Sequence, residues 1–89
     1  MEEFRIPSYV TITFFQDSAV LLDLRKNVYH ALNDTAADFW KLLTQTGSCE
    51  DALQKMLKLY QDSPDVIRRD VEALVFSLAK VGLLEPVIK

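Results

Sequence analysis

Hydrophobic and polar residues alternate with a period of two through the first third of the chain, a pattern typical of β-strands with one buried face. Residues 8–15 (SYVTITFF) are rich in β-branched and aromatic side chains. Residues 19–24 (AVLLDL) and 28–32 (VYHAL) repeat the pattern after short polar links, the second of which ends at Asn27, a residue that tolerates a left-handed backbone. Because short links join antiparallel neighbours, this region predicts a three-stranded meander.

After residue 32 the hydrophobic residues recur every three or four positions, which predicts amphipathic helices. Asn33 is a good N-cap and Gly47 a good terminator for the first helix. Ser63 and Pro64 form a start signal for a third helix that runs to Gly82. The expected buried stripes of the three helices are Ala36, Phe39, Trp40 and Leu43; Leu53, Met56, Leu57 and Tyr60; and Ile67, Val71, Leu74, Leu78 and Val81.

Strands followed by helices predict an α+β fold, with a three-stranded antiparallel sheet, then three helices, in a winged helix-turn-helix-like arrangement. The 89 residues suffice for one domain, so we expect residues 1–89 to form a single unit. The short tail after Gly82 contains Pro86, which argues against a central strand there.

The charge balance is mildly acidic, with 13 Asp and Glu residues against 10 Lys and Arg. Residues 64–82, the third expected helix, carry three residues of each sign, whereas a DNA-binding domain normally presents a basic face. The start MEEFRIPSYV lacks the pattern of a signal peptide, and no apolar run approaches the ~20 residues of a membrane span. We therefore expect a cytoplasmic protein that binds neither nucleic acid nor membrane.

Groups that catalyse reactions are sparse. His30 and Cys49 are the single histidine and the single cysteine. Cys49 falls at an expected helix start, where a thiolate is favoured, but nothing in the sequence orients a Cys–His pair, so a structural role is the simpler interpretation. The two glycines, Gly47 and Gly82, are too few for a phosphate-binding loop. We expect no enzymatic activity, no cofactor and no metal.

Two stretches resemble PqqD-like proteins: residues 21–43 (LLDLRKNVYHALNDTAADFWKLL) and residues 70–86 (DVEALVFSLAKVGLLEP). In that family a hydrophobic strand with an Asp leads through a turn to an aromatic strand, and a Leu-Asn step then enters a helix. Asn27 departs from the pattern, because the family often has Gly there. The matching residues are Leu21, Leu22, Asp23, Tyr29, Leu32, Asn33, Ala36, Trp40 and Leu43.

The resemblance implies a recognition element for ribosomally made, post-translationally modified peptides (RiPPs). Such a domain binds the leader of a precursor peptide and delivers it to a modifying enzyme. A free-standing chain of this length looks most like the leader-binding protein of lasso-peptide pathways, whose partner is a separate leader peptidase. The peptide chaperone PqqD, which serves a radical enzyme in quinone-cofactor synthesis, is the alternative within the family.

In that family the leader adds as a further strand along the third strand, beside the third helix. VYHAL fits this use because it contains no Pro or charge, the usual devices that protect an edge strand. The expected strand contacts are Val28, Tyr29, His30, Ala31 and Leu32. The expected helix contacts are an apolar pair with a polar rim, on an outward face made of Arg68, Arg69, Glu72, Val75, Phe76 and Ala79.

Three alternatives remain open from the residues alone. Spacing by itself favours an ordinary solvated face for Arg68 and Arg69. A winged-helix DNA-binding module and a purely structural subunit also fit the expected fold.

Overall fold

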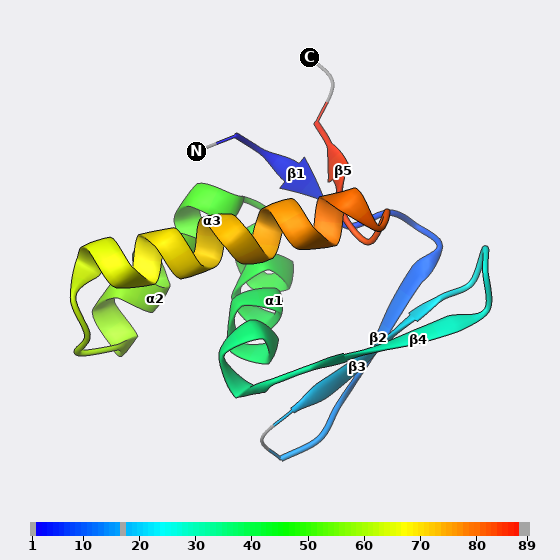
Figure 1. The fold of residues 1–89 in the computed structure, drawn as a ribbon, viewed down its shortest axis with the longest axis horizontal. Coiled ribbons are helices and arrows are strands. Elements are labelled where there is room, and N and C mark those ends of the chain that lie inside the picture. The colour runs from blue at the N-terminus through cyan, green and yellow to red at the C-terminus, as the bar shows by residue number, and fades with distance from the viewer. Residues whose placement is uncertain (1, 17, 88–89) are drawn as a thin grey trace.

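The computed structural model describes residues 2–16 and 18–87. Three strands form an antiparallel sheet in chain order: β2 (Val10–Phe14), β3 (Ala19–Asp23) and β4 (Val28–Leu32). Three helices follow: α1 (Asp34–Thr46), α2 (Cys49–Leu59) and α3 (Pro64–Lys80). Two short strands near the ends of the chain pair with each other: β1 (Phe4–Arg5) and β5 (Glu85–Pro86). In Figure 1, α3 crosses α1, and the sheet lies beside α1.

One face of the sheet is buried against the helices. On β3, Ala19, Leu21 and Asp23 are buried, whereas Val20 and Leu22 on the opposite face are only half-buried. This alternation follows from the two-residue period of a strand. The register places Leu21 between Ile12 and His30, so these two side chains share the helix-facing side.

The starts of α1 and α3 and the end of α1 form where the sequence predicts them. The Asn33 side chain accepts a hydrogen bond from the Ala36 N–H at 2.9 Å, and Gly47 ends α1 with φ of 73°. Ser63 precedes Pro64 as expected, but its side chain makes no capping hydrogen bond. Within the described chain, no helix has both the length and the apolarity to cross a bilayer.

The core is built around α1. Its Phe39 and Trp40 are almost fully buried, together with Leu21 of the sheet and Leu53 and Met56 of α2. Each large apolar side chain that is buried contributes roughly 1.5–3 kcal/mol, so α1 contributes strongly to the stability of both layers.

The fold class and all three predicted strands and helices are confirmed, and Asn27 adopts the left-handed conformation, with φ of 58°. The sequence did not predict the β1–β5 pair. The Glu3 carboxylate beside it accepts hydrogen bonds from the N–H groups of Cys49, at 2.7 Å, and Glu50, at 3.1 Å. The N-terminal segment thus caps the N-terminus of α2, where the helix dipole is positive.

Candidate functional site

The backbone hydrogen bonds between β2 and β3 determine which amides of the sheet point outward. The Phe15 N–H donates to Ser18 O at 2.8 Å, and the Leu24 N–H donates to Tyr9 O at 2.9 Å. An antiparallel strand directs its backbone groups alternately to its two neighbours. On β3, the even-numbered residues therefore pair with β2 and the odd-numbered residues pair with β4.

β4 has one paired and one open side. The odd-numbered residues of β3 lie opposite Val28, His30 and Leu32. The N–H and C=O groups of Tyr29 and Ala31 consequently point away from the sheet, and both residues are exposed. These four backbone groups are free to pair with another extended chain.

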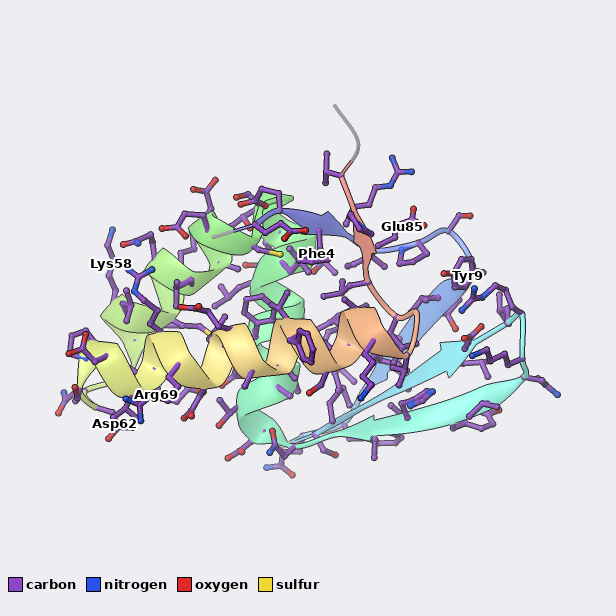
Figure 2. The ribbon with its side chains drawn as sticks, turned by 45° about the horizontal axis from the view of Figure 1, so that its top comes forward. Phe4, Tyr9, Lys58, Asp62, Arg69 and Glu85 are labelled. Atoms are coloured by element: carbon purple, nitrogen blue, oxygen red, sulfur yellow. The ribbon has the colours of Figure 1, made fainter. Side chains whose placement is uncertain are left out.

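A hollow of about 350 Å³ lies beside this open side, between β4 and α3. We call it the β4 groove. Figure 2 shows α3 and β4 running on either side of the region. Its lining is mainly apolar and consists of His30, Ala31, Leu32, Asn33, Ala36, Leu74, Ser77, Leu78, Val81 and Leu83.

The residues of α3 that the sequence predicted as leader contacts do not line the β4 groove. One of them, Val75, was expected on the outward face of α3, and this prediction is wrong. Val75 is only 3 % exposed, because it follows Val71 by one helical turn and belongs to the core stripe. Leu74 and Val81, which were expected to be buried, are half-buried and exposed, respectively, and line the β4 groove.

The other five expected helix residues do not line the β4 groove either. Arg69, Glu72 and Phe76 are exposed to solvent, with Phe76 69 % exposed. Arg68 lies on the side of α3 that faces α2, because its charge acts on Glu50 of α2. The pKa of Glu50 is lowered most by a hydrogen bond from Gln54 and further by the charge of Arg68. Ala79 is half-buried.

A second contact joins the sheet to α3 at the far end of β4. The Arg25 guanidinium lies 3.9 Å from the centre of the Tyr9 ring and donates to the Asp23 carboxylate at 3.2 Å. The Tyr9 hydroxyl donates to Gly82 O at 2.9 Å, in the turn that follows α3. We call these four residues the turn clamp.

The negative charge of Asp23 in the turn clamp is compensated by nearby hydrogen-bond donors. The Asp23 side chain is fully buried and also accepts the backbone N–H groups of Arg25, at 2.9 Å, and Lys26, at 3.4 Å. The Arg25 side-chain hydrogen bond lowers the pKa of Asp23 most, with help from these backbone donors, against the effect of burial. The carboxylate therefore stays ionised, and it fixes the β3–β4 turn.

Cys49 and His30 do not come together as a catalytic pair in the described structure. Cys49 is completely buried, its thiol donates to Phe4 O at 3.6 Å, and burial raises the pKa of the thiol. His30 is half-buried in the β4 groove. A buried thiol with a raised pKa is a poor nucleophile.

An open edge strand beside an apolar groove is the arrangement that domains use to bind peptides by β-strand addition. Residues 18–84 match the family described as Coenzyme PQQ synthesis protein D (PqqD). Because this match spans most of the chain, the chain belongs to the PqqD family. The resemblance of residues 21–43 and 70–86 to PqqD-like recognition elements is therefore confirmed.

Two solved structures are similar to the chain over nearly its whole length. One is TbiB1 in complex with the TbiA(beta) leader peptide, with 25 % identity, a TM-score of 0.86, and 96 % of this chain and 99 % of that chain covered. The other is a lasso peptide synthetase B1 complexed with the leader peptide, with 34 % identity, a TM-score of 0.79, and coverage of 93 % and 98 %. No curated protein sequence gave a significant match.

Sequence reasoning missed the groove-facing side of α3. Leu74, Ser77 and Val81 form a stripe at helical spacing next to the core stripe, and Ser77 is a polar interruption within it. That interruption is the available sequence signal that this flank is not packed in the core.

Proposed function

We propose that the chain binds the leader segment of a ribosomally made precursor peptide, of the lasso-peptide class, by adding it as a fourth strand to β4. The observation that carries this proposal is the pair of outward-facing residues Tyr29 and Ala31 directly beside the apolar β4 groove. Backbone pairing supplies affinity that does not depend on sequence, and the groove selects apolar side chains on alternate leader positions.

The similar structures support the lasso-peptide class of partner. Both contain a leader peptide, and one is a lasso peptide synthetase component with 34 % identity to the chain. The family match to PqqD supports the alternative, a peptide chaperone for quinone-cofactor synthesis. The two functions share the groove and differ in the precursor that fills it.

We also propose that the chain presents the bound leader to a separate leader peptidase or other modifying enzyme and performs no chemistry itself. The buried thiol of Cys49 supports this role, because it has no access to a peptide in the β4 groove. Cys49→Ala is expected to leave turnover by the partner peptidase intact, and loss of turnover with unchanged leader affinity would contradict the proposal.

Fluorescence polarisation tests the binding function. The two probes are the fluorescein-labelled leader of the precursor encoded with this chain and a labelled 20-base-pair DNA duplex, both at physiological salt. We expect saturable binding of the leader and only weak binding of the duplex, because α3 carries balanced charge. Tight duplex binding without leader binding would establish the winged-helix DNA-binding alternative.

A further inference from the structure

The β4 groove continues past the end of β4 along α3. A second hollow of about 380 Å³ shares Asn33, Ala36, Leu74 and Ser77 with it. A third, smaller hollow of about 80 Å³ shares Thr35, Met56, Asp70 and Val71 with the second. The three together form one path from β4 to the α2–α3 connection, so a strand added to β4 leads directly into it.

The chemistry of the path changes along its length. Leu74, Leu78 and Val81 line the β4 end. Asp70 lines both further hollows, and Asp62 lines the last one. None of the described residues that line these two further hollows is basic. A peptide that follows the path therefore passes from an apolar wall to a pair of carboxylates.

The charge around this end is reinforced from α1. The Tyr60 hydroxyl, on the wall of the last hollow, donates a hydrogen bond to the Asp38 carboxylate. Burial, the bond to Asp38 and the charges of Asp38 and Asp34 raise the pKa of Tyr60 to about 12. Asp38 and Asp34 of α1 thus add negative charge beside the last hollow.

We propose that the segment of the leader next to its strand-adding part carries a Lys or Arg that lies against Asp70 and Asp62. This inference rests on the proposed function and specifies its substrate. Charge complementarity carries it, because a cation is favoured at two carboxylates in a groove that is continuous with the strand-addition site. If the leader runs antiparallel to β4, the basic residue lies on the N-terminal side of the paired segment.

Selection from a display library of random 16-residue peptides against the immobilised protein tests the inference without a known leader. We expect the selected peptides to combine an apolar, strand-forming segment with Lys or Arg on one consistent flank. A synthetic consensus peptide then measures affinity, and replacement of its basic residue by Gln is expected to weaken binding about two- to fivefold.

Asp70→Asn is the decisive variant, and Glu72→Gln is its matched control. Both remove one exposed carboxylate from α3, but Glu72 does not line the path. In Asp70→Asn, and more so when it is combined with Asp62→Asn, the consensus peptide and its Gln variant should bind almost equally. Glu72→Gln should preserve the difference. Circular dichroism checks that each variant is folded.

The outcomes distinguish a failure of this inference from a failure of the proposed function. Selected peptides with no basic enrichment, or an equal effect of Asp70→Asn and Glu72→Gln, overturn the inference and leave strand addition standing. A library that yields no binding peptide at all overturns the proposed function together with the inference.

Discussion

The sheet meets α3 at two places, and these differ in how their polar groups are satisfied. At the turn clamp, Asp23, Arg25 and Tyr9 hold the start of β4 to the turn at Gly82 through hydrogen bonds within the chain. At the β4 groove, the backbone groups of Tyr29 and Ala31 instead point away from the sheet, and Ala31 also lines the apolar hollow. The clamp holds the two walls together, and the groove between them is left for a partner.

The difference indicates that the turn clamp has a structural role and that the β4 groove has a binding role. An exposed edge strand is normally protected, because it invites pairing with other chains. Here β4 carries no such protection, whereas the neighbouring turn is fixed by the ion pair between the buried Asp23 carboxylate and the partly exposed Arg25 guanidinium. Because the groove is preorganised, the protein loses less conformational entropy when a peptide binds, which favours affinity.

The largest expected effect distinguishes the two sides of β4. His30→Pro removes an amide that pairs with β3, so the free energy of unfolding should fall by about 3 kcal/mol. Tyr29→Pro and Ala31→Pro remove outward amides, so the domain should remain folded while leader affinity falls about tenfold. Thermal melts by circular dichroism and fluorescence polarisation measure the two effects.

A specific result would contradict this assignment. If Tyr29→Pro and Ala31→Pro unfold the domain as readily as His30→Pro, the backbone directions derived from the register are wrong. If the two folded variants bind the leader like the parent protein, the leader does not add to β4.

The next effect concerns the turn clamp. Gly82 has φ of 83°, and a Cβ there would lie 2.5 Å from Arg25 Nη2. Gly82→Ala should lower the free energy of unfolding by about 1–3 kcal/mol from backbone strain, plus a further cost from displacing Arg25. Gly47→Ala is the control, because Gly47 has φ of 73° with no atom within 4 Å of its Cβ position.

Urea unfolding of the two variants isolates the contact with Arg25. The clamp predicts that Gly82→Ala is the less stable variant and that it also weakens leader binding. Equal stability of the two variants would show that the Arg25 contact contributes nothing beyond the backbone conformation.

The ionisation of Asp23 gives the turn clamp a pH dependence. The pKa of Asp23 is lowered in the folded protein, chiefly by the Arg25 hydrogen bond. A lowered folded pKa contributes stability that is present above the unfolded value, near 4, and is lost as the pH falls through the folded value. The parent protein should therefore lose stability on acidification more steeply than Asp23→Asn, measured as melting temperature between pH 6 and pH 2.5.

Much of the fold was predictable because its signals are local. Period-two alternation identified β2 to β4, and side-chain and glycine caps such as Asn33 and Gly47 identified helix ends. The β1–β5 pair was not predictable, because two-residue strands carry no periodic signal. The capping of α2 by Glu3 joins residues 46 or more positions apart, at Cys49 and beyond, and no local pattern indicates such a contact.

The candidate site was predictable in its strand and not in its helix. The open edge follows from the order of three short strands, which the sequence indicates directly. The flank of α3 that faces β4 depends on how α3 crosses α1. Leu74 and Val75 are consecutive apolar residues on neighbouring faces of α3, so the hydrophobic pattern allows α3 to be rotated about its axis in more than one way. The structure selects the orientation that buries Val75 and turns Leu74 toward the groove.

The smallest expected effect tests that orientation. Leu74 lines the β4 groove, whereas Phe76, two residues later, is exposed on another face of the same helix. Leu74→Ala removes apolar surface that a bound leader would cover, so leader affinity should fall about three- to tenfold. Phe76→Ala removes a larger side chain and should change affinity by less than about twofold. Fluorescence polarisation on folded variants makes the comparison. A larger loss from Phe76→Ala than from Leu74→Ala would place the leader on the outward face of α3, against the geometry of the groove.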